Sequence, residues 1–287
     1  MTRRSRRALG AALEALTRRY GAAYLGTSAL MFPRRYREPA DQEVVGLLAA
    51  CLAYGRVNLF AGAVEQILAA LGEHPADAVR RFLPRRHSRR LAGFHYRLNR
   101  PADIAAALWA LRRILEEFGS LKACFLAGYR EEDGDIRPAL TAFVDRITRT
   151  DLTPVFPHGV PSRGFRHLFP DPRAGGACKR LNLFLRWMVR PDDGLDLGLW
   201  PEVPPAKLII PLDTHVARVA RALGLTRLKS PGWRTAKAIT EALKTFDPAD
   251  PVRYDYALCR FGIVEGAGKG ARLSVRAVLR HRPGDHP

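Results

Sequence analysis

Two residues that can act together on a carbon centre lie in one stretch of the chain, between Asp171 and Leu225. Lys179 follows a Gly-Gly turn and opens one amphipathic helical pattern, and Asp213 follows a Pro-Leu pair and opens another. A neutral lysine amine is a nucleophile, and a nearby carboxylate can accept its proton and stabilise positive charge. We therefore take Lys179 and Asp213 as candidate catalytic residues of one site.

Both residues also have a structural interpretation. A lysine in the first turn of a helix is commonly solvated. Aspartate is a favoured N-cap, here for a helix whose apolar residues recur at helical spacing from Val216 to Leu223. On local physics alone these roles are favoured over catalysis, although one carboxylate can both cap a helix and act as a base.

The turn before Lys179 has the properties of an anion site. The backbone N–H groups of Gly175, Gly176 and Ala177 precede a helix, where they can receive a phosphate, and glycine lets such a ligand approach closely. Positive charge from Arg180 and from the helix N-terminus would favour a fraction of neutral amine at Lys179, as nucleophilic attack requires.

The helix expected from Cys178 to Val189 separates two faces on a helical wheel. The lysine lies on the polar face, so we expect it to point away from the core of its own helix. The apolar face consists of Leu181, Phe184, Leu185 and Met188, and the polar face of Lys179, Asn182, Arg186 and Arg190.

Composition indicates a globular protein with a polyanionic partner. The chain has 287 residues and a net charge of +19, and such a surplus attracts nucleic acid in particular. Of its 47 basic residues 40 are arginines, for which a bias in codon usage or growth temperature is a partial alternative cause.

The cysteines and histidines do not form metal-binding patterns. Cys51, Cys124, Cys178 and Cys259 are far apart, without a CxxC pair, and the eight histidines are scattered. We expect reduced thiols, no metal, no iron–sulfur cluster and no cofactor, in a cytoplasmic protein. No apolar run approaches the roughly 18–20 residues of a membrane span, and the basic N-terminus is better explained as an amphipathic helix.

The periodicity is helical almost throughout, without a convincing alternating strand, and this predicts an all-α protein. We expect Asp41 to cap a helix over 42–55, and residues 153–176 to be turn and loop because proline and glycine are frequent there. Further helices are expected over 58–71, 75–83, 102–119, 121–129, 136–148, 178–189, 214–224, 235–246 and 252–263.

The segment Pro211–Val219 resembles the aspartate loop and following helix of the helix-hairpin-helix DNA glycosylase superfamily, most closely over Leu-Asp-Thr-His-Val-Ala-Arg-Val. The hairpin upstream departs from the pattern, because Ala-Gly-Gly-Ala-Cys-Lys replaces its usual Leu-Pro-Gly-Val-Gly. The spacing of 34 residues from Lys179 to Asp213 is similar to that in the archaeal 8-oxoguanine glycosylase branch. The whole chain also resembles an uncharacterised bacterial family related to these enzymes.

The resemblance implies two helical subdomains that contain a helix-hairpin-helix, with an active-site cleft between them. One would be a helical barrel over 41–190, ending in the hairpin and the lysine-bearing helix. The other would combine 1–40 with 205–287, and 191–204 would be an inserted loop. DNA contacts are implied for Arg56, Asn58, His95, Tyr96, Arg97, Arg173, Gly175, Gly176, Ala177, Arg180, His215 and Arg218.

The function that the resemblance implies is base-excision repair. A monomeric cytoplasmic enzyme, associated with the nucleoid, would bind double-stranded DNA that contains a damaged or abasic nucleotide and flip that nucleotide out. Lys179 would form a Schiff base and Asp213 would assist, giving glycosylase and abasic-site lyase activity; an oxidised purine such as 8-oxoguanine is the best guess for the base. The alternatives are a non-catalytic DNA-binding protein that keeps the fold and an RNA-binding helical protein.

Overall fold

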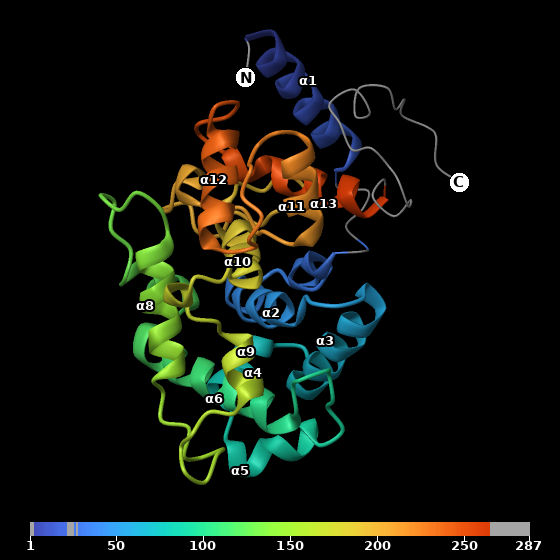
Figure 1. Ribbon diagram of the computed structural model, residues 1–287. Helices are drawn as coiled ribbons and strands as arrows, with labels where there is room; N and C mark the ends of the chain where they lie inside the picture. Colours follow the sequence, from blue (N-terminus) through green and yellow to red (C-terminus); the bar gives the residue numbers. More distant parts are fainter. Residues whose placement is uncertain (1–2, 22–25, 27, 265–287) are drawn as a thin grey trace. The chain divides into compact units, whose positions relative to one another are not determined.

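The computed structural model describes residues 3–21, 26 and 28–264. Within these ranges every regular element is a helix, and strand pairing is limited to the isolated bridges Tyr96–Asn99 and Gly176–Gly232 (Figure 1). The all-α class predicted from the helical periodicity is thus confirmed for this part of the chain.

Contacts divide the chain into two compact units. The terminal unit comprises Met1–Gly26 and Gly175–Pro287, and the middle unit comprises Thr27–Ala174. The lysine-bearing helix α10 (Lys179–Val189) belongs to the terminal unit, whereas the domain prediction grouped it with the barrel. Those domain boundaries stay a prediction, since a contact unit is not the same quantity as a fold-family domain.

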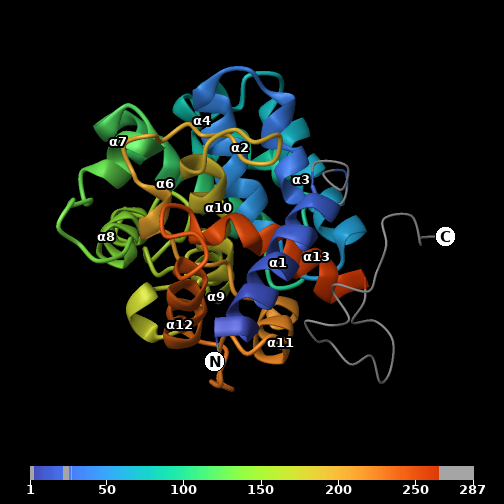
Figure 2. The same cartoon turned by 90° about the horizontal axis from the view of Figure 1, so that it is seen from above.

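In the terminal unit the first and the last described helix pack against each other. Helix α1 (Arg3–Arg19) buries Leu9, Leu13 and Leu16 at helical spacing and packs against the C-terminal helix α13, as Figure 2 shows. Helix α11 also packs on α13. The remaining elements of the unit are η6 (Pro205–Lys207), α11 (Thr214–Ala222), α12 (Trp233–Lys244), η7 (Pro251–Tyr254) and α13 (Asp255–Val264).

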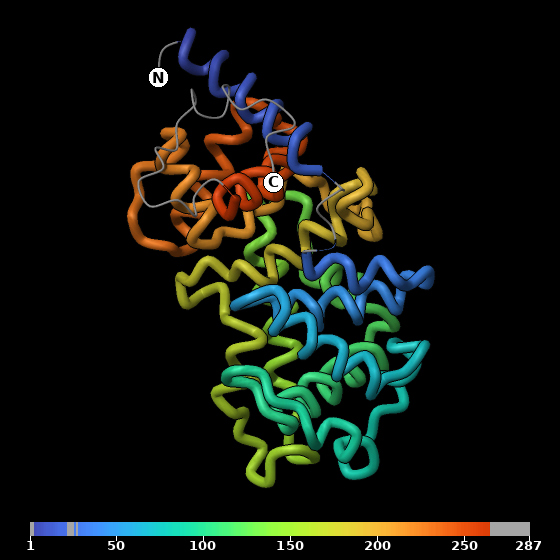
Figure 3. Tube along the Cα trace, turned by 90° about the vertical axis from the view of Figure 1, so that its right-hand side faces the viewer, coloured from blue at the N-terminus to red at the C-terminus, as the bar shows by residue number. Residues whose placement is uncertain are grey.

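The middle unit is built around α2 (Pro39–Leu52) and α6 (Pro101–Phe118), whose alanine, leucine and valine side chains are almost fully buried. Helix α2 lies beside α3 (Val57–Leu71), as can be followed in Figure 3. The other elements are η2 (Ala29–Met31), η3 (Pro33–Arg35), α4 (Pro75–Arg80), α5 (Pro84–His87), η4 (Ser88–Leu91), α7 (Leu121–Leu126), α8 (Arg137–Thr148), α9 (Arg163–Leu168) and η5 (Pro172–Ala174).

Two local predictions in the middle unit are wrong. Helix α2 begins at Pro39, before Asp41, because proline is well suited to a first helical position. Asp41 is buried in the first turn, where its Oδ1 accepts a hydrogen bond of 2.7 Å from the Ala76 N–H. The segment 153–176 is not wholly irregular: Ser162 caps α9 through a 2.9 Å bond from the Phe165 N–H to its hydroxyl.

The inserted loop 191–204 is part of the core of the terminal unit. The N–H of Leu197 donates to the carbonyl of Trp187, and the N–H of Trp200 donates to the carbonyl of Met188, each at 2.8 Å. The Trp200 ring is fully buried and meets the Phe184 ring edge-on, with centroids 5.3 Å apart. The loop therefore terminates α10 and covers it.

Candidate active site

Lys179 is the first residue of α10 and is half-buried. Cys178 before it has a φ of 46°, in the left-handed region that residues other than glycine rarely adopt. Gly175 has a φ of 80°, and Gly175 and Gly176 are both exposed. A Cβ atom added at either glycine would meet no atom within 4 Å, so the backbone before the lysine is open to an approaching ligand.

This glycine turn is fixed to the start of α12. The N–H of Trp233 donates to the Gly175 carbonyl at 2.9 Å, and Gly176 pairs with Gly232. A Cβ at Gly232 would lie only 2.8 Å from the Gly175 oxygen, so glycine is required there. On the helix side, the Asn182 amide donates to the Ala177 carbonyl at 3.0 Å. The turn is therefore held from both sides.

Asp213 is the N-cap of α11, as its sequence context predicts. Its Oδ1 accepts a hydrogen bond of 2.8 Å from the Val216 N–H. Its Oδ2 accepts a bond from the thiol of Cys259 in α13, with sulfur and oxygen 3.5 Å apart. The carboxylate is half-buried and is held in one orientation by two elements.

Helix α13 contacts Asp213 and the helix that carries Lys179. Burial raises the pKa of Asp255 to about 6; the paired Arg186 opposes the rise, the charge of Asp213 adds to it, and that of Lys179 counteracts it. Burial also raises the pKa of the Cys259 thiol, with the same signs for Asp213 and Lys179. In the contacts themselves, Asp213 meets the Cys259 thiol of α13, and Arg186 of the lysine-bearing helix pairs with Asp255 of α13 at 2.7 Å.

Asp255 and Cys259 were missed by the sequence analysis. Both lie in an amphipathic pattern that reads as an ordinary packing helix, and nothing local marks them as neighbours of Lys179. The only sequence signal is an aspartate at the start of a helix, which normally indicates a cap. Asp255 is instead buried, and its Oδ1, like Oδ1 of Asn182, has no hydrogen-bond partner among the described residues.

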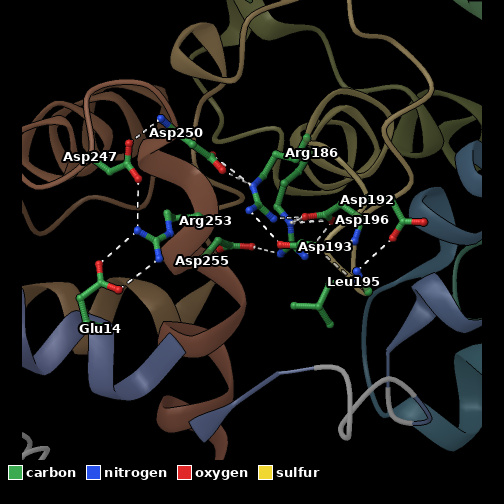
Figure 4. A network of polar contacts seen from close by, with 12 residues as sticks. Glu14, Arg186, Asp192, Asp193, Leu195, Asp196, Asp247, Asp250, Arg253 and Asp255 are labelled. Carbon is green, nitrogen blue, oxygen red and sulfur yellow. Dashed lines mark hydrogen bonds and ion pairs between the residues drawn. The ribbon is translucent and has the colours of Figure 1, made fainter. Parts of the chain in front are cut away.

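The face of α10 that was predicted to be polar does carry polar side chains, but most of them are buried instead of exposed to solvent. Asn182, Arg186 and Arg190 are all at most 5 % exposed. Arg186 donates to Asp255 at 2.7 Å and to Asp196 of the inserted loop at 3.0 Å (Figure 4). Carboxylates from segments distant in sequence therefore surround this face, where the helical wheel predicts solvent.

Arg190 extends this network along the helix. Its guanidinium pairs with Asp250 at 2.9 Å, with Asp193 at 3.0 Å and, by a short contact, with Asp196. Asp196 is fully buried between the two arginines. Arg186 therefore holds α10 to α13, and both arginines hold it to the inserted loop.

A family model described as "Protein of unknown function (DUF2400)" matches residues 29–264. The chain belongs to this family. No curated protein matches the DUF2400 chain, and no solved structure matches it either. The matched range includes α10, α11 and α13, so the cluster around Lys179 and Asp213 lies in the part that defines the family.

In this DUF2400 protein two segments predicted to contact DNA meet within the middle unit. Arg56 and Asn58 are exposed, although Asn58 lies in the first turn of α3 and not in the preceding loop. His95 is exposed as well. The Arg97 guanidinium covers Gly55, where an added Cβ would lie 2.7 Å from its Nε. The arginines at positions 56 and 97 are thus brought to one place.

Tyr96 and Arg173 are less available than predicted. Tyr96 is 4 % exposed, and its hydroxyl donates a short hydrogen bond to the Tyr54 carbonyl, so that any effect on a ligand would be indirect. The exposed Arg173 side chain forms ion pairs with Asp145 at 2.6 Å and with Asp171 at 2.9 Å. Its charge is therefore largely compensated before any phosphate arrives.

The residues of α11 that were predicted to contact DNA also have hydrogen-bond partners within the protein. Nδ1 of His215 lies 3.2 Å from the Gly262 carbonyl, and Nη2 of Arg218 donates to that carbonyl at 2.5 Å. These contacts hold α11 against α13. Arg180 is only 9 % exposed. His215 and Arg218 therefore have structural contacts in addition to any contact with a ligand, and Arg180 is largely buried.

Within the described ranges, no group of three or more histidine, cysteine, aspartate or glutamate side chains could hold a metal ion. The four cysteines are free thiols. No helix in the described part of the chain is long and apolar enough to cross a membrane.

Proposed function

We propose that this protein is a DNA glycosylase with abasic-site lyase activity, in which Lys179 is the nucleophile and Asp213 assists it. One observation carries the proposal: α13 contacts both elements, since its Cys259 thiol donates to Asp213, the cap of α11, and its Asp255 pairs with Arg186 of α10, the helix that Lys179 opens. Residues 34 positions apart are thus gathered within one compact unit.

Three further features support the proposal. The segment around Asp213 resembles the aspartate element of helix-hairpin-helix DNA glycosylases. The open backbone at Gly175 and Gly176 suits a phosphate, as the hairpin of that superfamily does. The net charge of +19 suits a polyanionic substrate. On this proposal the partner is duplex DNA that contains a damaged or abasic nucleotide.

The proposed reaction begins with a nucleotide turned out of the stack, which costs a few kcal/mol. The neutral amine of Lys179 attacks the anomeric carbon, the glycosidic bond breaks, and the base leaves with its electron pair. Asp213 stabilises positive charge on the sugar and accepts a proton from the nitrogen. Opening of the sugar ring gives a Schiff base, and loss of a proton from the adjacent carbon then expels the 3′-phosphate and nicks the strand.

The structural contacts of Asp213 fit this role. Its Oδ1 is occupied by the helix cap, and its Oδ2 is contacted by a thiol, which is a weak donor. The carboxylate is therefore oriented without being neutralised by a cation at close range in any of these bonds. A fixed orientation lowers the cost of positioning the base during the reaction.

Borohydride trapping tests the proposal. The full chain is incubated with a duplex that carries an abasic site, and reduction fixes the Schiff base as a covalent adduct. We expect an adduct with the wild type, none with Lys179→Gln, and an undiminished one with the matched control Lys229→Gln, since Lys229 is exposed in the same unit. No adduct with the wild type, or an equal one with K179Q, would favour a non-catalytic DNA- or RNA-binding protein.

Asp213→Asn separates chemistry from folding. Asparagine is as good an N-cap as aspartate, so α11 should remain stable. We expect the rate of adduct formation to fall by about 10²- to 10⁴-fold, while binding to the abasic duplex is retained. A panel of duplexes with single damaged bases, scored for strand nicking, then identifies the base removed, with an oxidised purine such as 8-oxoguanine as the expected substrate.

A further inference from the structure

The basic stretch from Arg85 to Arg90 takes no part in the proposed active site. It forms α5 and η4 in the middle unit, beside a cavity of about 610 Å³. Among the described residues that line this cavity none is acidic. Its basic lining residues are Arg80, Arg81, Arg86, His87, Arg90 and Arg112.

Most of this positive charge is uncompensated. Arg80 lies 3.6 Å from Asp77, and Arg112 lies 2.7 Å from Glu116, so these two have carboxylate partners. Within the described residues Arg81, Arg86 and Arg90 form no ion pair, and all three are exposed. Three guanidinium groups beside a concave surface are the donors that a phosphorylated ligand requires.

His87 confirms that these arginines converge. Its Nδ1 accepts a hydrogen bond of 2.8 Å from the Leu83 N–H, so the neutral ring carries its proton on Nε2, which is a donor. Burial lowers the pKa of His87, and the charges of Arg90, Arg86 and Arg112 lower it further. The imidazole is thus surrounded by positive charge and remains neutral.

A second cavity, of about 450 Å³, adjoins the first and shares Leu83 and Arg86 with it. Trp109 lines it, and its indole N–H donates to the Asp151 carbonyl at 2.9 Å. The Arg112 guanidinium lies 5.4 Å from the centroid of the indole ring. The ring is therefore held in place next to the arginines, where an aromatic base can stack on it.

We propose that these two cavities form a nucleotide-binding site of the middle unit, with the phosphates held by Arg81, Arg86 and Arg90 and the base beside Trp109. Both volumes fall within the roughly 300–1,000 Å³ of small-molecule sites. The site lies wholly in the middle unit, apart from the residues of the proposed reaction, and does not depend on it.

Calorimetric titration of the full chain with adenosine triphosphate and with inorganic tripolyphosphate tests this site. We expect one nucleotide to bind per chain and to bind more tightly than tripolyphosphate. The double variant R86Q/R90Q should bind the nucleotide at least about tenfold more weakly, because two phosphate contacts are lost. The matched control R130Q/R163Q, which removes two exposed arginines of the same unit, should stay within about twofold.

Trp109→Leu isolates the contribution of the base. It should abolish the preference for the nucleotide over tripolyphosphate and leave the affinity for tripolyphosphate unchanged. Equal affinity of the wild type for the two probes would overturn the role of Trp109. Absence of saturable binding, or equal weakening in R86Q/R90Q and in R130Q/R163Q, would overturn the site as a whole, because non-specific attraction would then explain the binding.

A short single-stranded oligodeoxynucleotide distinguishes the two sources of nucleotide phosphates. If the oligonucleotide displaces the triphosphate, and if R86Q/R90Q weakens the binding of the oligonucleotide whereas R130Q/R163Q does not, the site takes a nucleotide within a strand. If it fails to displace the triphosphate, the site takes a free nucleotide. The melting temperature of each variant, compared with that of the wild type, verifies that the exposed substitutions leave the fold intact.

Discussion

Asp213 has a structural role as a helix cap and, on the proposed function, a chemical one as well. Its Oδ1 caps α11, a function that the Asp-Thr-His sequence predicts, while its Oδ2 faces the thiol of Cys259. The cap is a contact between residues three positions apart, whereas the thiol is 46 positions away. The first could therefore be predicted from sequence, and the second required the packing of α11 on α13.

Asp255 should make the free energy of unfolding decrease as the pH rises, which is the opposite of the usual effect of a carboxyl group. Burial raises its pKa to about 6, so the folded chain holds this proton more tightly than the unfolded chain, whose value is about 4. The resulting stabilisation is complete below about pH 4 and is lost as the pH rises through about 6.

The variant Asp255→Asn cannot ionise and so does not lose this stabilisation. The free energy of unfolding of D255N minus that of the wild type should rise by about 2 kcal/mol between about pH 4 and about pH 7. Urea denaturation at a series of pH values measures it. A difference that stays constant over this range would show that Asp255 titrates normally.

At the scale of elements, α10 is the helix on which the site depends. Its apolar face could be predicted because it follows from local periodicity. The environment of its polar face could not, because Arg186 pairs with Asp196 and Asp255, which are 10 and 69 residues away. A helical wheel gives the direction in which a side chain points, but it does not reveal which partner lies there.

The other limits of sequence reasoning have the same origin. The glycine turn before Lys179 could be predicted as open, since Gly175 and Gly176 carry no side chain. The requirement for glycine at position 232 could not, because it depends on the approach of the Gly175 carbonyl. Likewise, Tyr96 reads as a surface aromatic until its contact with Tyr54 is known.

The ion network on α10 should be essential for the stability of the terminal unit. Asp196→Asn leaves Arg186 and Arg190 buried with one carboxylate fewer, and breaking a buried pair in this way costs about 3 kcal/mol or more. Urea denaturation at neutral pH should show this loss. The control Asp192→Asn, at an exposed position of the same loop, should change stability by at most about 0.5 kcal/mol. Equal effects of the two substitutions would contradict a structural role for the network.

At the scale of the whole molecule, the net charge of +19 predicts attraction to a polyanion. The net charge could be read directly from the sequence. Which basic side chains are exposed and which have partners within the protein could not. Arg173, His215 and Arg218 have internal partners, whereas Arg56, Arg81, Arg86 and Arg90 are exposed and form no ion pair with a described residue. Net charge therefore predicts attraction to a polyanion but does not identify the residues that make contact.

Binding to duplex DNA should weaken steeply with salt, because each phosphate contact releases counterions. For six to ten contacts we expect the affinity for a duplex with an abasic-site analogue to fall by about a thousandfold or more between about 50 mM and about 200 mM salt. Fluorescence anisotropy measures this. Lys179→Gln, which removes one charge, should change the logarithmic slope by at most about one. An affinity that hardly varies over this range would rule out a mainly electrostatic interface.

The docking of the loop 191–204 has a consequence for motion. Leu197 and Trp200 satisfy carbonyls that the end of α10 would otherwise leave open, so the segment that links Lys179 to Asp213 is rigidly held. On the proposed function, this rigid segment preorganises the two groups and reduces the entropy that substrate binding must overcome. The same proposal then assigns the motion that admits an extruded nucleotide to other segments of the chain.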